Sequence, residues 1–364
     1  MSSFVQALRN SILYTGYRKP LLVVSALTFS LFWLTVLSVG IGAVTVSPAQ
    51  VITILAEQVG LPGWVSYEPV QKAILLNIRL PRVVLAVLTG AALAVSGAAM
   101  QGLFRNPLAD PGLIGVSSGA ALAAAVAMVA AGAVSAAWIE PIATFLVPVA
   151  AFAGGVLATM LVYKLATERG RTDVATMLLA GIAVNAMAGA VIGFMIFLAN
   201  DDQLRDYTFW TLGSLGGATW GSVWVVLPLL LAAILFLPGL SRGLNAILLG
   251  EAEARHLGVP VERLKRLIVL FVGLAVGAAV SVSGMISFVG LVVPHILRLW
   301  MGPDHRFLLP GSAILGGLLL LGSDLLARTL VAPAELPIGV ITATTGAPFF
   351  LWLLLKNRKS GQFL

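Results

Sequence analysis

Residues that could perform chemistry are few in this chain and lie far apart in the sequence. The three histidines are His256, His295 and His305, and there is no cysteine among the 364 residues. All three histidines map to predicted loops or helix ends, without carboxylates at metal-ligand spacing. The sequence has no HExxH motif and no GxxxxGKS/T phosphate loop. We therefore expect no catalytic residue, no metal site and no ATP bound by this chain.

Two arginines, Arg79 and Arg82, flank Pro81 just before an apolar run at 83–104. Proline favours the first helical position and an extended residue before it, so the sequence predicts a helix that begins at Pro81. Arg82 then lies in the first turn, where the helix dipole disfavours a cation. Two interpretations stay open. The arginines anchor the helix at the lipid headgroups, or they form a docking point for an acidic partner.

The composition indicates a membrane protein. The chain is 59% hydrophobic and 10% charged, whereas soluble domains carry about 25% charged residues. No polar segment is long enough for a soluble domain, so we expect one transmembrane domain over residues 1–364. The first apolar run, near Leu21, is too long for a cleavable signal. The net charge of +7 does not indicate nucleic-acid binding, because membrane proteins concentrate Lys and Arg in cytoplasmic loops.

Apolar runs long enough to cross a bilayer recur along the chain. The predicted membrane helices are 21–43, 83–104, 113–131, 142–165, 174–199, 221–238, 308–326 and a last one that ends at 355. Residues 45–78 read as an amphipathic connector, and 200–220 as an interfacial helix and turn. The apolar stretch 267–301 is interrupted by glycines and a proline, which allows either two short crossings or one broken element.

The basic residues predict the orientation. With a cytoplasmic N-terminus, 17 of the 22 Lys and Arg residues fall on the cytoplasmic side. The remaining five are Lys72, Arg79, Arg82, Arg205 and Arg328. This bias predicts that both termini are cytoplasmic, together with the segments 1–20, 240–266 and 356–364. Charge alone allows either eight or ten crossings.

Ionisable residues are nearly absent from the middles of the predicted helices. Ion-coupled carriers usually bury such residues there, so the energy source is expected outside this chain. The segment 240–266 is the best candidate for the connection, because Leu248, Leu249 and Leu257 stand among its charges. The pattern predicts a short helix, a stop at Gly258 and a second helix entering the bilayer. The alternative is an ordinary loop whose basic residues only set topology.

Several long motifs, in order along the chain, resemble one family. They are RLPR at 79–82, NPLADPGLIGVSSGAALA from 106, GEAEARHLGV at 250–259, GLVVPHILRL at 290–299 and ELPIGVITATTGAPFFLWLLLK at 335–356. Together they resemble the permease subunits of ABC importers for iron-siderophores, haem and vitamin B12, the FecCD family. The resemblance covers nearly the whole chain after about residue 70. The runs at 104–124 and 206–220 look most like haem permeases.

The resemblance implies an all-α type II ABC importer permease with ten transmembrane helices, acting as a homodimer in the inner membrane. Two ATP-binding subunits would drive it from the cytoplasm, with ATP and Mg bound there and no cofactor on this chain. A periplasmic substrate-binding protein would deliver an iron chelate, haem or a corrinoid, and selectivity would reside in that protein. The alternatives are an ATPase-independent secondary carrier or channel, marked by intramembrane charges, and an intramembrane enzyme, marked by a catalytic dyad.

The resemblance also implies roles for particular positions. The residues that match the family's binding-protein docking site are Arg79, Arg82 and Arg328. Those that match its cytoplasmic gate are Asn106, Leu108, Val174 and Ala175. Those that match its coupling helix, which sits in a groove of the ATPase subunit, are Gly250, Glu251, Ala254, Arg255, Leu257 and Gly258.

Overall fold

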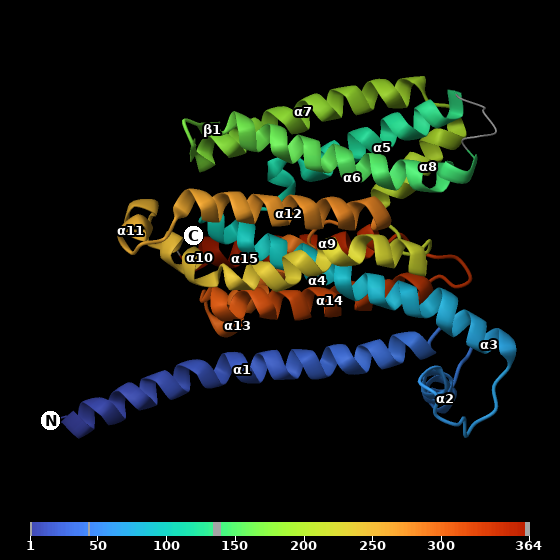
Figure 1. The fold of residues 1–364 in the computed structure, drawn as a ribbon, viewed down its shortest axis with the longest axis horizontal. Coiled ribbons are helices and arrows are strands. Elements are labelled where there is room, and N and C mark those ends of the chain that lie inside the picture. Colours follow the sequence, from blue (N-terminus) through green and yellow to red (C-terminus); the bar gives the residue numbers. More distant parts are fainter. Residues whose placement is uncertain (1, 43, 134–139, 361–364) are drawn as a thin grey trace.

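Helix α4, Leu80–Leu103, runs through the middle of the molecule, and α9, α12, α13 and α14 pack around it (Figure 1). The computed structural model describes residues 2–42, 44–133 and 140–360. Small residues let the neighbours of α4 come close. A Cβ atom on Gly97 would lie 1.9 Å from the carbonyl oxygen of Gly290 on α13, and one on Gly90 would lie 2.3 Å from that of Gly316 on α14. Close contact between backbones is how helices associate in lipid.

The described chain is almost entirely helical. Its helices are α1 (Ser2–Gly40), α2 (Pro48–Gln58), α3 (Pro69–Ile74), the π-turn η1 (Leu75–Arg79), α4, the 3-10 turn η2 (Pro111–Ile114), α5 (Val116–Ala133), α6 (Glu140–Leu165), α7 (Val174–Leu198), α8 (Asp201–Leu212), α9 (Trp220–Gly239), α10 (Ser241–Leu248), α11 (Glu251–His256), α12 (Val261–Ser283), α13 (Val289–Met301), α14 (His305–Thr329) and α15 (Ile338–Ser360). Two short antiparallel strands, β1 (Thr167–Glu168) and β2 (Arg171–Thr172), form a hairpin between α6 and α7.

Seven helices of the described chain are long and apolar enough to cross a membrane. Three shorter apolar helices, 116–130, 289–301 and 338–353, bring the set to the predicted ten. The all-α polytopic fold is therefore confirmed. In the ambiguous stretch 267–301, α12 is a full-length helix, residues 284–288 break the chain, and α13 is a separate shorter helix.

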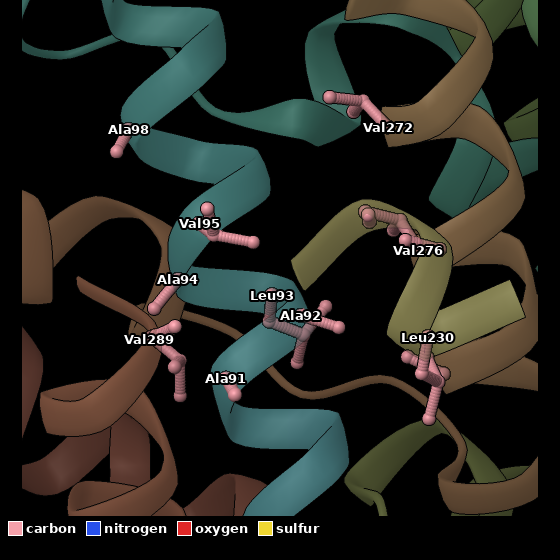
Figure 2. Packing of buried hydrophobic residues seen from close by; sticks show 14 of the residues in the cluster. Ala91, Ala92, Leu93, Ala94, Val95, Ala98, Leu230, Val272, Val276 and Val289 are labelled. Carbon is pink, nitrogen blue, oxygen red and sulfur yellow. The ribbon is translucent and has the colours of Figure 1, made fainter. Parts of the chain in front are cut away.

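The interior is filled mainly by small aliphatic side chains. Figure 2 shows the alanines and valines of α4, with Val289 of α13 on one side and Leu230 of α9 on the other. Val272 and Val276 of α12 complete this layer. All of these residues are buried, so α4 contacts protein rather than lipid along most of its length.

The two ends of the bundle carry different elements (Figure 1). The N-terminus, α10, α11 and the β-hairpin lie at one end, here called the α11 end. The helices α2, α3 and α8 lie at the other, here called the α8 end. The five basic residues that were predicted to lie away from the cytoplasmic side belong to α3, η1, α4, α8 and the last turn of α14.

The predicted helix start at Pro81 is wrong. The chain is helical without interruption from Pro69 to Leu103, and Leu80 has helical dihedral angles rather than extended ones. The π-turn explains the difference, because the amide of Leu80 donates to the carbonyl of Leu75, five residues back. This wider turn accommodates a proline, which has no N–H and would crowd an ordinary turn. Arg82 therefore does not lie in a first turn, and the dipole argument does not apply to it.

The first helix also begins earlier than predicted. α1 starts at Ser2, so the polar segment 1–20 continues the membrane helix rather than preceding it. Pro20 lies inside α1 without ending it. Charged residues indicate where a helix leaves the membrane, whereas helix ends depend on caps and breakers, so polarity alone placed this boundary too late.

Candidate functional site

Arg82 forms ion pairs at the α8 end. Its Nε atom lies 2.8 Å from Oδ1 of Asp324 on α14, and its Nη1 atom lies 2.8 Å from Oε1 of Glu335. The Asp324 side chain is fully buried, whereas that of Glu335 is 45% exposed. Arg328 stands 3.6 Å from the second oxygen of Asp324. Two arginines thus compensate one buried carboxylate, which would be very costly to bury alone.

Arg79 and Arg328 bind the carboxyl-terminal end of α1. Arg79 donates to the carbonyls of Val39 and Gly40, at 3.0 and 2.7 Å. Arg328 donates to the carbonyls of Ser38 and Ile41, at 2.6 and 3.0 Å. The last carbonyls of a helix have no partner within the helix, and a cation there also suits the helix dipole. These arginines therefore cap α1.

The three outer arginines thus have partners inside the chain. Arg79 is only 4% exposed and Arg82 only 6%. These contacts close α1, α4 and α14 on one another, and they join residues 242 and 287 positions apart, so the sequence pattern around each arginine did not predict them. Their role in docking a binding protein stays a prediction.

The segment 240–266 holds two short helices, α10 and α11, where one was predicted, and then the start of α12, the predicted helix that enters the bilayer. The predicted stop at Gly258 is confirmed, because α11 ends before it and Gly258 adopts a positive φ of 81°. Leu249 and Leu257 are 68% and 66% exposed, while Ala254 is buried against the bundle. Two large apolar side chains therefore face outward beside charged ones, a pattern typical of a surface that binds another protein.

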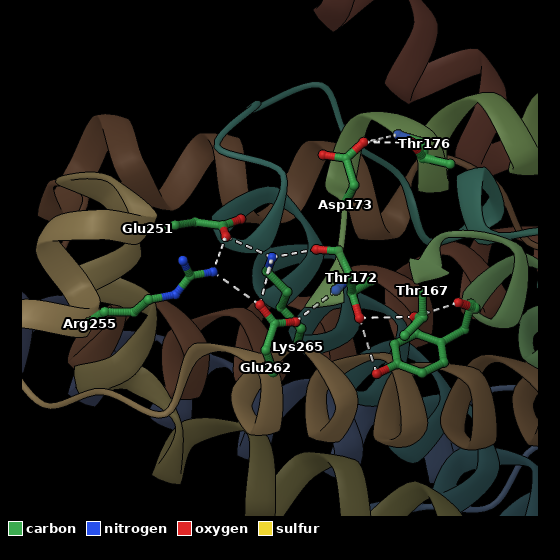
Figure 3. Close-up of polar contacts among 9 residues, drawn as sticks. Thr167, Thr172, Asp173, Thr176, Glu251, Arg255, Glu262 and Lys265 are labelled. Carbon is green, nitrogen blue, oxygen red and sulfur yellow. Dashed lines mark hydrogen bonds and ion pairs between the residues drawn. The ribbon is translucent and has the colours of Figure 1, made fainter. Parts of the chain in front are cut away.

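A cluster of charges around the buried Lys265 lies directly behind α11 (Figure 3). Lys265 of α12 is 1% exposed and donates from Nζ to Oε2 of Glu251 at 2.8 Å and to the carbonyl of Thr172 at 2.6 Å. Glu262, one turn earlier on α12, accepts from the backbone N–H of Thr172 at 2.8 Å and pairs with Arg255 at 3.1 Å. The sequence placed Lys265 among the basic residues of the segment 240–266 but did not predict this cluster.

The predicted gate residues lie at two sites, and all of them except the half-buried Val174 are exposed. Val174 and Ala175 begin α7, directly after Thr172 and the N-cap Asp173. The hydroxyl and backbone N–H of Thr176 bind the Asp173 carboxylate and hold its pKa below the ordinary value.

The other predicted gate site is the elbow after α4. There the side chain of Asn106 accepts from the backbone N–H of Leu108 at 2.8 Å, which forms a tight Asx turn. Leu108 projects from this turn and is 36% exposed. An exposed leucine on a locally braced turn suits a contact with another surface.

A cavity of about 400 Å³ with a partly polar lining lies between the elbow, α5, α7 and the break after α12. Asp110, Ser117, Ser118, Asn185 and Ser287 are among its lining residues. The Asn185 amide donates to the carbonyl of Gly112, whereas its Oδ1 atom is buried without a partner. Sequence reasoning missed this cavity, because its polar residues come from four separate segments.

The histidines do not gather. His256 is exposed at the end of α11, and His305 is buried with its Nδ1 atom 2.9 Å from Oδ1 of Asn245. His295 lies inside α13 against Phe349 and Phe350, so its predicted place in a loop or helix end is wrong. Among the described residues, no three His, Cys, Asp or Glu side chains are arranged to hold a metal ion.

Comparison with known proteins identifies the family. The profile of the FecCD transport family matches residues 30–356. The hemin transport system permease protein HmuU of Yersinia pestis is 48% identical over 284 residues, which cover 78% of this chain and 84% of that protein. The cobalamin import system permease protein BtuC of Halobacterium salinarum is 46% identical over 278 residues, which cover 76% and 72%. The vitamin B12 import system permease protein BtuC of Escherichia coli is 40% identical over 300 residues, which cover 81% and 89%.

A solved structure has the same fold. It is described as an inward-facing conformation of a metal-chelate type ABC transporter, and it is 30% identical with a TM-score of 0.78. The match covers 92% of this chain and 99% of the solved one. The chain belongs to the FecCD transport family and is a multi-pass membrane permease of the ABC transporter type, not an enzyme.

Proposed function

We propose that this chain is the permease of an ATP-driven importer that moves haem into the cytoplasm. The 48% identity to a hemin permease is the observation that favours haem as the substrate. Identities of 46% and 40% to cobalamin permeases make a corrinoid the second candidate, and a ferric siderophore is the third. The cavity beside Asp110 lies next to the elbow, and we place it on the substrate's path.

The assembly we propose is a homodimer with two ATP-binding subunits at the α11 end. The exposed Leu249 and Leu257 support this site, because they present apolar surface outside the membrane helices. The α11 end is then cytoplasmic, together with both termini, as the excess of basic residues there also favours. ATP and Mg²⁺ are bound by those subunits, and this chain binds no cofactor of its own.

A substrate-binding protein docks on the α8 end in this proposal. Arg79, Arg82 and Arg328 contribute by holding α1, α4 and α14 in register, since their guanidinium groups already have partners. Glu335 is the half-exposed member of the cluster and is available to a partner. The affinity of the binding protein for a Glu335→Gln complex tests this. Unchanged affinity would remove Glu335 from the docking surface.

The elbow and the start of α7 form the exit gate in this proposal. Leu108 and Ala175 are exposed in the single chain. Residues that contact a second protomer must be exposed in this way before the two protomers assemble. A cysteine introduced at Leu108 is the only one in the chain, so crosslinking between protomers in different nucleotide states tests the gate. Absence of any crosslink in every state would place the elbow away from the two-fold axis.

The transport test uses the complex of permease, ATPase and binding protein in proteoliposomes. We expect ATP-dependent uptake of haem, with little uptake of cyanocobalamin or of a ferric siderophore. Preferred uptake of cyanocobalamin would establish the second candidate. Uptake of any of the three without ATP would support a secondary carrier and overturn the proposal.

The coupling surface is tested by Leu257→Glu. A leucine buried at an interface contributes roughly 1.5–3 kcal/mol, so the variant should bind its ATPase at least about tenfold more weakly. The matched control is Leu61→Glu, which alters an exposed leucine in a loop at the α8 end. Equal ATPase retention by the two variants would show that α11 is not the docking surface.

A further inference from the structure

Lys265 joins three segments that are distant in the sequence. It belongs to the first turns of α12, and its ammonium group contacts Glu251 on α11 and the backbone of Thr172 at the end of β2. Figure 3 shows the ammonium group between these two partners, with Glu262 beside it. A lysine is almost never fully buried unless it is paired, so these contacts are what permit its burial.

Thr172 is bound through both of its backbone polar groups. Lys265 binds the carbonyl at 2.6 Å, and Glu262 accepts from the N–H at 2.8 Å. Both side chains come from α12, so this residue cannot shift along the helix without losing two charge-assisted hydrogen bonds. Thr172 stands two positions before Val174, the first residue of α7. The start of α7 is therefore fixed to the base of α12.

The same two side chains hold α11. Glu251, the first residue of α11, accepts from Lys265, and Arg255 bridges back to Glu262 at 3.1 Å. This helix has six residues and an exposed outer face, and Ala254 is its one buried residue. A displacement of α11 therefore acts on the charge cluster as well as on the packing of Ala254.

We propose that Lys265 is a positioning residue that transmits motion of α11 to the start of α7, and so couples ATPase docking to the exit gate. This inference rests on the proposed function for the direction of transport, but the mechanical link is a property of the chain alone. A buried ion pair suits such a link, because its hydrogen bonds are short and directional and are costly to break. An apolar contact would hold the segments together without fixing their direction.

The test is Lys265→Met, which keeps the aliphatic stem and removes the ammonium group. The matched control is Lys164→Met, since Lys164 is an exposed lysine in the last turn of α6 at the same end. Both variants are purified with the ATPase and binding protein. The readouts are the ATP hydrolysed per haem imported and the distance between spin labels on Ala175→Cys in the two protomers, with and without nucleotide.

We expect Lys265→Met to keep ATP hydrolysis while the ATP used per haem rises about tenfold, the size of a typical coupling between sites. The nucleotide-dependent change in label distance should disappear. Lys164→Met should match the parent protein in both readouts, and Lys265→Arg should restore part of the coupling, because it keeps the charge. An assembled Lys265→Met complex whose ATP cost stays within about twofold of the parent overturns the proposal.

A second variant decides the matter if Lys265→Met does not assemble. Glu251→Ala removes the contact of Lys265 with α11, together with the exposed Glu251–Arg255 pair inside that helix, and leaves Lys265 beside Glu262 and Thr172. It should uncouple α11 from α7 in the same way, and a normal label response in it overturns the proposal. The label distance requires nucleotide and the ATPase but no particular substrate. A parent complex that responds to nucleotide without importing haem would therefore defeat the proposed substrate and leave the link standing.

Discussion

The two ends of the bundle both bury charged side chains, but the elements they join are different. At the α8 end, Arg82 and Asp324 connect α4 and α14, two long helices that already pack along their length. At the α11 end, Lys265 connects a membrane helix to a six-residue helix and a hairpin. The first cluster reinforces a contact that packing would maintain. The second joins two short surface elements to the base of α12 through charge-assisted hydrogen bonds.

This difference teaches how to interpret a buried charge. Burial shows that a charge has a partner, and it says nothing about function. The mobility of the partner element is the informative property. Long helices in the core move little, whereas short surface helices open at low cost. The cluster of Arg82, Asp324 and Arg328 at the α8 end therefore mainly stabilises the fold. The cluster around Lys265 at the α11 end is placed to transmit motion.

The largest effect should come from Arg82→Ala. The substitution leaves Asp324 fully buried with only Arg328 nearby, at 3.6 Å. Removing one partner of a buried ion pair typically costs about 3–5 kcal/mol. We expect a clear loss of thermal stability in the detergent-solubilised protein, measured by the temperature at which it unfolds or aggregates.

The control for this variant is Arg205→Ala, which alters an exposed arginine of α8 at the same end. Its stability should stay close to that of the parent. If the two variants were equally stable, Arg82 would not stabilise the fold. A direct contact between Arg82 and the substrate-binding protein would then be the better explanation. A stable Arg82→Ala protein that fails to bind the substrate-binding protein would identify the arginine as a docking residue.

A smaller and more local effect is expected from Arg79→Met. It removes the guanidinium donors to the carbonyls of Val39 and Gly40 at the end of α1. An unsatisfied buried acceptor costs about 1–3 kcal/mol. The loss should appear as faster hydrogen exchange in the last turn of α1, with little change in α12. Unchanged exchange in that turn would contradict the capping role.

Local pattern was enough to predict the membrane helices and the helix stop at Gly258. These features depend on runs of apolar residues and on single breakers, which are read directly from the chain. The break between the predicted helices 83–104 and 113–131 was likewise predicted. The π-turn was not, because it depends on how one helix continues through Pro81, which local rules describe only as a helix start.

Partners distant in sequence were the part that could not be predicted. Arg82 and Asp324 are separated by 242 positions, and Lys265 and Thr172 by 93. A single sequence gives the charge of each residue but not its neighbour in space. The arginines therefore seemed unpaired, and Lys265 seemed to be one more basic residue of a cytoplasmic loop. The packed helices instead give the arginines partners within the chain and bury Lys265 in a charge cluster.

The smallest effect should come from Arg255→Ala, although this arginine lies in the same cluster as Lys265. Its side chain is 48% exposed, and it pairs with Glu251 at 3.4 Å and Glu262 at 3.1 Å. Exposed pairs contribute about 0.2–1 kcal/mol, because water and salt screen them. Stability and the ATP used per haem should stay near the parent values, since Lys265 keeps its own contacts to Glu251 and Thr172.

This variant separates the two explanations of the α11 cluster. If coupling depended on the summed charge near α11, Arg255→Ala and Lys265→Met would each remove one positive charge and would impair transport alike. If coupling depends on the buried bridge, only Lys265→Met should raise the ATP cost of import. Transport and ATP hydrolysis measured side by side in the two variants, at low and at high salt, distinguish these cases. A large transport defect in Arg255→Ala, reproduced in the parent protein by high salt, would assign coupling to the exposed ion pairs. The two ends of the bundle would then differ in how strongly salt screens their ion pairs, and not in whether those pairs are buried.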